Sequence, residues 1–260
     1  MLYGAIIGDI CGSIYEGALP NNDVELFEEG DTFTDDTVCT CAVAEALLTD
    51  GDFGKHLKSL ALKHPYRGYG PSFRAWINDP DAGPYNSFGN GAIMRVSPTA
   101  WAYDSIDDVL YAAQASAMPS HNHPEAIKAA KAVAHAIFWA RNKVDKKSIV
   151  NDLLHDIYKY PVLSSEEIKD SYDFNITCQS SMPVVICAFN ESNSFEECIL
   201  NAIRFGGDTD TNAAVAGSIA EAYYGIPEDF IHIVRLYLEP DLLNIVSKFE
   251  STFSKKLQTI

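Results

Sequence analysis

Two acidic stretches, each directly ahead of an apolar segment with helical periodicity, constrain this chain more than any other feature. Residues 34–37 read Thr-Asp-Asp-Thr and precede the apolar residues 38–48. Residues 206–212 read Gly-Gly-Asp-Thr-Asp-Thr-Asn and lie between two apolar segments. Thr and Asp are good N-caps, but a helix start needs only one cap, and each stretch supplies several candidates. Capping therefore explains only part of the pattern.

A shared cation site explains the remainder. If the two helix starts met without a counter-charge, Asp35, Asp36, Asp208 and Asp210 would repel one another. Carboxylate and hydroxyl oxygens suit Mg²⁺, Mn²⁺ or Ca²⁺, whereas structural zinc prefers cysteine and histidine. Four Asp with neighbouring Thr could hold two ions a few ångströms apart, each with water left for a substrate.

Helical patterns cover the chain, and nothing reads convincingly as a strand. Gly4, Gly8 and Gly12 recur at four-residue spacing and would let a second helix approach closely. No linker, repeat or low-complexity block divides the sequence, so we expect one all-α domain over residues 1–260. The expected helices are residues 2–16, 38–48, 53–64, 105–118, 123–141, 146–158, 182–189, 194–205, 212–224 and a helical region at 228–255, with a short helix from residue 73. Residues 173–181 are expected to be irregular, and Pro183 is expected to introduce the helix at 182–189.

Composition narrows the class of partner. The 260 residues include 36 acidic and 19 basic ones, for a formal charge of −17, and 47% are hydrophobic, as in globular proteins. Such a surface repels phosphate backbones and anionic lipid, so we expect neither nucleic acid nor a membrane as partner. The six cysteines form no Cys-x-x-Cys pair, which favours reduced thiols in a cytoplasmic protein. The apolar residues 1–14 lack the basic start of a signal peptide and are expected in the mature fold.

Three further features have both a functional and an ordinary structural interpretation. Residues 87–91, Ser-Phe-Gly-Asn-Gly, can expose backbone amides to an anion at a helix start, although most glycine-rich turns are only turns. His121 and His123 flank another helix start, where a neutral imidazole could donate to a ligand or simply face solvent. Glu16 follows the first helix, either as a solvated loop residue or as a group near a cation.

Five motifs in order make the chain resemble the ADP-ribosylglycohydrolases, which include the dinitrogenase-reductase-activating glycohydrolases and the eukaryotic ADP-ribosyl-acceptor hydrolases. They are Gly8-Asp9 with Glu16, Phe33-Thr-Asp-Asp-Thr37, residues 87–95, His121-Asn-His-Pro124 and Gly206-Gly-Asp-Thr-Asp-Thr211. The resemblance spans nearly the whole chain. It implies a compact, orthogonal all-α bundle with two divalent cations, Mg²⁺ or Mn²⁺, in a central cleft.

The resemblance also assigns residues. It implies catalytic roles for Glu16 and Asp35, with Glu16 near the metals and the scissile bond. The implied metal ligands are Thr34, Asp35, Asp36, Asp208, Asp210 and Thr211. The implied ADP-ribose-binding residues are Ser87, Phe88, Gly89, Asn90, Gly91 and His121, with backbone amides around the diphosphate and Phe88 against the ligand. Asp79 and Asp81 are only rough matches to a further acidic residue of some relatives.

The expected function is therefore release of ADP-ribose from a modified acceptor, with arginine as the default linkage by analogy. Alternatives are a non-catalytic, crystallin-like ADP-ribose-binding protein, or the same chemistry on serine-linked or non-protein ADP-ribose. The expected partners are ADP-ribose and ADP-ribosylated proteins, and the expected state is a cytoplasmic monomer.

Overall fold

The computed structural model describes residues 1–170 and 174–257 and confirms the expected all-α fold. Within these residues no strand forms, and extended pairing is limited to an isolated bridge between Gly89 and Thr177. The helices are α1 Tyr3–Gly12, η1 Ser13–Tyr15, α2 Asp35–Leu48, α3 Phe53–Lys63, α4 Pro71–Asn78, α5 Gly91–Met94, α6 Thr99–Ala102, α7 Ile106–Ala117, α8 Pro124–Arg141, η2 Ser148–Ile157, α9 Ser165–Asp170, α10 Cys178–Asn190, α11 Phe195–Arg204, α12 Thr209–Tyr224, α13 Glu228–Tyr237 and α14 Pro240–Leu257.

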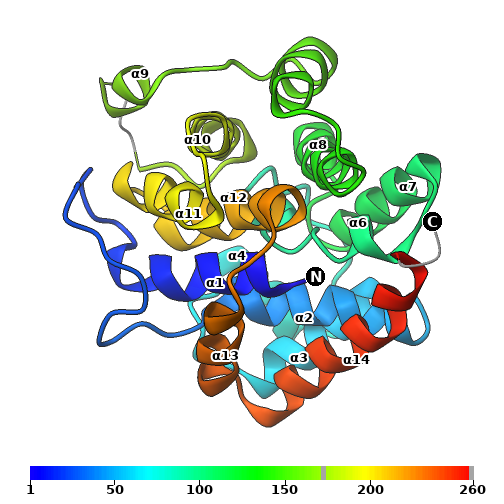
Figure 1. Cartoon of the computed structure of the whole chain (residues 1–260). Helices are drawn as coiled ribbons and strands as arrows, with labels where there is room; N and C mark the ends of the chain where they lie inside the picture. Colours follow the sequence, from blue (N-terminus) through cyan, green and yellow to red (C-terminus); the bar gives the residue numbers. More distant parts are fainter. Residues whose placement is uncertain (171–173, 258–260) are drawn as a thin grey trace.

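The centre of the molecule is the pair α1 and α12, which lie side by side (Figure 1). The glycines of α1 make this contact possible. A Cβ at Gly8 would lie 2.1 Å from the carbonyl oxygen of Ala213, and one at Gly4 would lie 2.3 Å from that of Gly217. Real atoms cannot approach so closely, so the two backbones touch only because these side chains are absent. The predicted close approach of another helix to the glycine stripe is confirmed.

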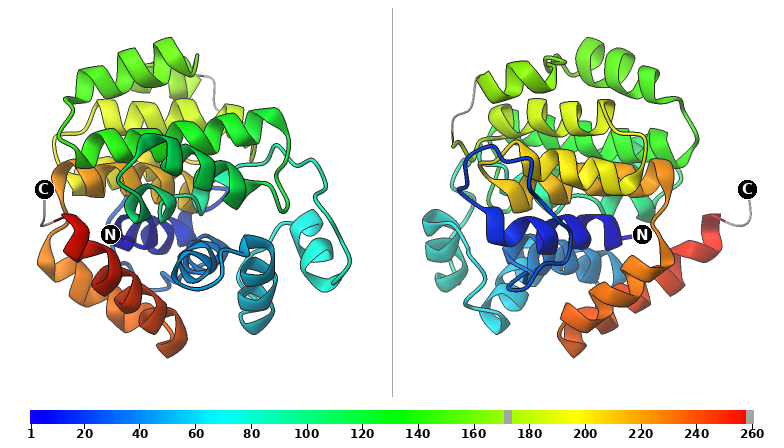
Figure 2. Two further views of the ribbon diagram at one scale, coloured as in Figure 1. Left: turned by 90° about the vertical axis from the view of Figure 1, so that its right-hand side faces the viewer. Right: turned by 60° about the vertical axis from the view of Figure 1, so that its left-hand side comes forward.

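The other helices form layers on both sides of this pair (Figure 2). Helices α8, α10 and α11 pack on α12, while α2 packs on α1 and is itself covered by α3 and α14. Most residues of α12 are buried, as expected of a helix that is covered by neighbouring helices on several sides.

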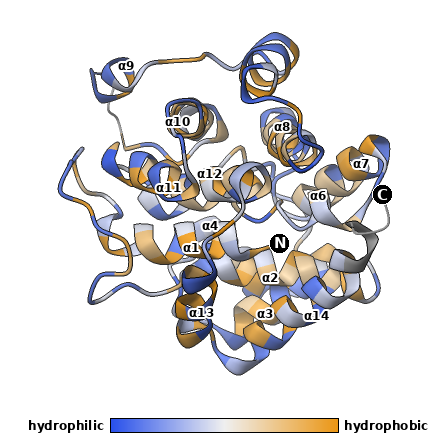
Figure 3. Cartoon of the chain, in the orientation of Figure 1, coloured by the Kyte–Doolittle hydropathy of each residue, from blue (hydrophilic) through white to orange (hydrophobic). Residues whose placement is uncertain are grey.

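The outermost helices have a different pattern. Along α3 and α14, hydrophobic and hydrophilic residues alternate along the ribbon (Figure 3). In α3 the buried side includes Leu57, Leu60 and Ala61. These amphipathic helices close the lower layer and present their polar sides to solvent.

Several predicted helix boundaries were wrong. The helix expected at 182–189 begins at Cys178, where Thr177 caps it, and Pro183 lies inside it instead of introducing it. The segment 173–181 was expected to be irregular; its last four residues are helical, and Asp173 lies outside the described residues. The region 228–255 divides into α13 and α14 because Pro240 has no N–H with which to continue α13.

The first helix is also shorter than predicted. It ends at Gly12, and the single 3₁₀ turn η1 then leads to Glu16. The six cysteines are buried and form no disulfide, as expected of reduced thiols. Within the described part of the chain, no helix has the length and apolar character needed to cross a membrane.

Candidate active site

The predicted meeting of the two acidic helix starts is present in the structure. Oxygens of Asp9, Asp36 and Asp210 lie within 4.8 Å of one another, and so do oxygens of Glu16, Asp208 and Asp210. Asp210 belongs to both groups and joins them. With Asp35, which neighbours them at the start of α2, these side chains form what we call the acidic cluster: Asp9, Glu16, Asp35, Asp36, Asp208 and Asp210.

Asp9 was not among the predicted site residues, yet it organises the start of α2. It is fully buried in α1. Its carboxylate accepts hydrogen bonds from the backbone N–H of Thr34 at 2.9 Å and of Thr37 at 3.0 Å, and from both threonine hydroxyls. These hydrogen bonds stabilise a charge that would otherwise be buried without partners. In the sequence, the feature that could have indicated this role is a single carboxylate in an apolar, glycine-rich helix.

The two threonines predicted as ligands lie at the cluster in different ways. The hydroxyl of Thr34 donates to Asp9 at 2.6 Å and caps α2 by accepting from the backbone N–H of Asp36 at 3.4 Å. The hydroxyl of Thr211 donates to Oδ2 of Asp36 at 3.3 Å. Thr211 therefore connects α12 to α2, and it lines the cleft described below.

No Lys or Arg of the described residues forms an ion pair with the acidic cluster. Burial and then the charge of Asp9 raise the pKa of Asp35 to about 8. Burial and the neighbouring carboxylates also raise the pKa values of Asp36 and Asp210 well above the usual range. The pKa of Glu16 is raised by its partial burial and then by Asp208. The protein alone thus leaves this concentration of negative charge uncompensated.

The cluster fits divalent cations. Oδ1 of Asp36 is buried and accepts no hydrogen bond, so it has a lone pair directed at no protein donor. The available donors are carboxylate and hydroxyl oxygens, which hard cations such as Mg²⁺ and Mn²⁺ prefer.

All members of the acidic cluster except Asp9 line a cleft of about 420 Å³. Aromatic side chains of the loop before α4 and of α4 line the same cleft, together with Tyr85 and the loop that leads into α5. Besides Glu16, Asp35, Asp36, Asp208, Asp210 and Thr211, the lining includes Gly68, Tyr69, Gly70, Phe73, Arg74, Tyr85, Ser87, Gly89, Asn90, Gly91, Met94, Arg95, His121, Phe174 and Ile176.

The loop at residues 87–91 reaches the cluster through a side chain that was predicted for another role. Nδ2 of Asn90 donates to Oδ2 of Asp208 at 2.5 Å. The backbone amides expected to surround a diphosphate are partly engaged. That of Gly89 donates to Oγ of Ser87, and that of Asn90 donates to the carbonyl of Ile176.

Two further predicted residues, His121 and Phe88, differ in their position relative to the cleft. His121 is buried and lines the cleft beside Gly89 and Gly91. Phe88, in contrast, is 47% exposed, does not line the cleft and lies against His123. The packing of Phe88 against the ligand stays a prediction.

His123 has a structural role: it caps α8 by accepting from the N–H of Glu125 at 3.1 Å. Asp79 and Asp81 are exposed and lie outside the cleft lining. Neither therefore extends the acidic cluster.

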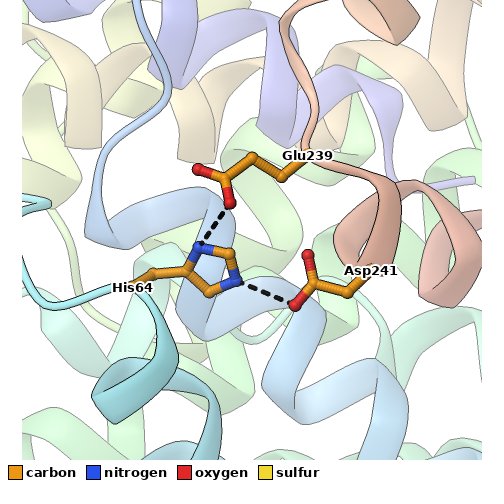
Figure 4. A group of neighbouring side chains, drawn as sticks. All are labelled: His64, Glu239 and Asp241. Atoms are coloured by element: carbon orange, nitrogen blue, oxygen red, sulfur yellow. Dashed lines mark hydrogen bonds and ion pairs between the residues drawn. The ribbon is translucent and has the colours of Figure 1, made fainter.

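A second group with metal-binding side chains lies elsewhere. His64 contacts Asp241 through Nε2 at 3.0 Å and Glu239 through Nδ1 at 3.4 Å (Figure 4). The two carboxylates face opposite nitrogens of the ring, so each nitrogen of His64 already has a carboxylate partner. Arg67 also binds Glu239, at 2.7 Å. This group ties the start of α14 to the loop before α4.

Fold and site together define an all-α protein with a cleft that is lined by oxygen ligands suited to divalent cations. The chain belongs to the ADP-ribosylglycohydrolase family, whose sequence model matches residues 1–256. The family resemblance carried by the five motifs is confirmed.

Individual relatives have about a quarter of their residues in common with this chain. Mouse ADP-ribosylhydrolase ARH3 is 27% identical, over 93% of this chain and 88% of the relative. The ADP-ribosylarginine hydrolase Tri1 of Pseudomonas putida is 26% identical, over 86% of this chain and 70% of the relative. A solved structure described as an ADP-ribosylglycohydrolase-related protein complex superposes with a TM-score of 0.73 at 26% identity, over 93% of this chain and 92% of that chain.

Proposed function

We propose that this protein is a metal-dependent hydrolase that releases ADP-ribose from an ADP-ribosylated acceptor, most readily a protein arginine. The observation that carries the proposal is the largely buried, uncompensated acidic cluster, most of which lines a cleft large enough for a nucleotide-sized ligand. Membership of the ADP-ribosylglycohydrolase family supports the proposed substrate class.

Two divalent cations, Mg²⁺ or Mn²⁺, would be held by Thr34, Asp35, Asp36, Asp208, Asp210 and Thr211. When bound, they supply Lewis-acid chemistry that orients the hydroxyls of the distal ribose and activates water. The N-termini of α2 and α12 bring the carboxylates that would bind these cations close together. Asp9 and Asn90 fix Thr34 and Asp208 in position.

Glu16 is the proposed proton-transfer group at the reacting carbon, with Asp35 beside it. Hydrolysis forms a bond from the water oxygen to the anomeric carbon, breaks the glycosidic bond and moves a water proton to the leaving acceptor atom. A carboxylate whose pKa is raised by burial and by Asp208 is a stronger proton acceptor than an ordinary Glu. Its side chain is exposed and lines the cleft.

The remote part of the substrate is held along the cleft. His121 and the loop of residues 87–91 would face the diphosphate, so that binding energy from this end positions the reacting ribose. The aromatic residues Tyr69, Phe73 and Tyr85 line the same cleft and offer apolar surface.

Charge supports arginine as the acceptor. An ADP-ribosylated guanidinium keeps its positive charge, which favours its approach to a protein of formal charge −17. The O-glycosidic linkage to serine is neutral and gains nothing from this field. The printed activity of the Tri1 relative, an ADP-ribosylarginine hydrolase, points the same way.

The test compares arginine-linked, serine-linked and nucleotide-linked ADP-ribose, each with Mg²⁺, with Mn²⁺ and with a chelator. Release from the arginine conjugate that requires metal is the expected result. Faster release from serine or nucleic acid would overturn the acceptor assignment. Tight ADP-ribose binding without release from any substrate would instead favour the non-catalytic, crystallin-like alternative.

A further inference from the structure

Arg95 is an unusual residue for the wall of a ligand cleft. It is fully buried, yet it makes no ion pair with any carboxylate of the described residues. Its Nη2 donates to the carbonyl of Ser116 at 3.1 Å and to Oγ of Ser120 at 2.8 Å. Nε and Nη1 have no partner. A buried cation without a paired carboxylate is costly, so its position calls for a function.

The contact with Ser120 has a consequence for the next residue. Oγ of Ser120 also lies 2.7 Å from Nδ1 of His121. A guanidinium can only donate, so one lone pair of Oγ is taken by Arg95. If Nδ1 carried a proton it would occupy the other lone pair, and the Ser120 hydroxyl hydrogen would be left buried without an acceptor. That costs free energy. The favoured arrangement has the hydroxyl donating to an unprotonated Nδ1.

His121 then has a defined proton. Burial, and then the positive charge of Arg95, hold its pKa well below the usual range, so the ring is neutral and carries one N–H. With Nδ1 as acceptor, that proton is on Nε2. Nε2 faces the loop before α5: it lies 2.9 Å from where a Cβ would stand on Gly91 and 3.7 Å from the same position on Gly89. No described residue forms a hydrogen bond with it, and the ring lines the cleft.

We infer that Arg95 and Ser120 are positioning residues that hold His121 as the Nε2–H tautomer, a permanent hydrogen-bond donor to the substrate diphosphate. The inference deepens the proposed function and rests on it. A neutral donor is useful here, because it binds an oxyanion equally well throughout the physiological pH range. A protonated His121 would be a cation, and the acidic cluster could attract it away from the phosphates; the neutral ring avoids this.

The test reads the tautomer directly by long-range ¹H–¹⁵N NMR of protein with ¹⁵N-labelled histidine, with His121 assigned by the loss of its signals in His121→Gln. In the wild type, Nδ1 should appear as an unprotonated and Nε2 as a protonated nitrogen. Ser120→Ala should populate both tautomers. Arg95→Lys keeps a cationic donor and should retain the wild-type tautomer. The matched control is Ser116→Ala, which removes a buried hydroxyl bonded only to Ala113 and should change nothing at His121.

The second readout is calorimetric binding of ADP-ribose in saturating Mg²⁺. Ser120→Ala should weaken ADP-ribose roughly tenfold, the effect of one misdirected hydrogen bond to a charged group, while its Mg²⁺ affinity stays at the wild-type value. A protonated Nδ1 in the wild type would overturn the inference. So would an unchanged tautomer and affinity in Ser120→Ala. A wild type with the expected tautomer that binds no ADP-ribose would instead refute the proposed function and the diphosphate role with it.

Discussion

The side-chain amide of Asn90 connects the loop of residues 87–91 to the acidic cluster. Nδ2 donates to Oδ2 of Asp208 at 2.5 Å and to Oγ of Ser181 at 2.9 Å, and all three side chains are buried. Both hydrogens of the amide are therefore used, and one of them fixes the orientation of a proposed metal ligand. Groups that orient a ligand from behind commonly matter nearly as much as the ligand itself.

Asn90→Ala should therefore weaken Mg²⁺ or Mn²⁺ binding by about 10- to 100-fold, because Asp208 loses the donor that holds it. Calorimetric titration of the metal-free protein measures the effect. Ser181→Ala is the matched control, since it removes the other partner of the same amide and leaves the bond to Asp208. Equal metal affinity in Asn90→Ala and the wild type would show that Asp208 needs no such support.

Gly8→Ala tests the helix pair at the centre of the fold. The added Cβ would meet the backbone of Ala213 at 2.1 Å, and backbone atoms of two packed helices cannot move aside as a flexible side chain can. We expect a loss of about 3 kcal/mol in the free energy of unfolding, measured by urea denaturation. Gly83→Ala is the control, because a Cβ there meets nothing within 4 Å. If the free energy of unfolding falls no more in Gly8→Ala than in the control, α1 and α12 can move apart at little cost in stability.

The sequence predicted that another helix approaches the glycines of α1, and that the two acidic helix starts meet, for a physical reason. Evenly spaced glycines and surplus carboxylates at two caps are local patterns with few alternative explanations. Asp9 was harder to place, because its importance depends on Thr34 and Thr37 approaching it from another helix. The residues around Asp9 in the sequence do not indicate its contact with Thr34 and Thr37.

Other features lay beyond local reasoning. The side chain of Phe88 belongs to the motif, but only the path of the loop directs it towards His123 and away from the cleft. Pro183 was expected at a helix start and lies inside α10, because the cap at Thr177 fixes the start earlier in the chain. The link from Arg95 through Ser120 to His121 joins Arg95 to a serine 25 positions later in the sequence, and it depends on distances that no spacing rule supplies.

The metal-free protein should become less stable as pH rises from about 4 to about 8. Asp35 has a pKa of about 8 in the folded state, against 3.8 for an ordinary Asp. Between these values the folded protein keeps a proton that the unfolded chain has released, so unfolding releases a proton and the free energy of unfolding falls with pH. The raised pKa values of Asp36 and Asp210 act in the same direction.

Thermal unfolding in chelator between pH 5 and 8 measures this dependence. Saturating Mg²⁺ should reduce it, because cations compensate the ionised carboxylates in the folded state. High salt is the control: it screens the charged surface but not buried groups, so the dependence should persist. A metal-free protein that gains stability over this interval would contradict the assignment of raised pKa values to the cluster.

Asp36→Asn should separate stability from function. The buried carboxylate is repelled by Asp9, Asp35 and Asp208 in the metal-free protein, and the amide removes that repulsion at nearly constant shape. The variant should therefore unfold at a higher temperature than the wild type in chelator. Mg²⁺ should stabilise it less than it stabilises the wild type. Hydrolysis of arginine-linked ADP-ribose should fall by orders of magnitude. Asp241→Asn, which alters a carboxylate bonded to His64 outside the cleft, is the control and should leave Mg²⁺ binding intact. An Asp36→Asn protein that hydrolyses its substrate at the wild-type rate would remove Asp36 from the metal ligands.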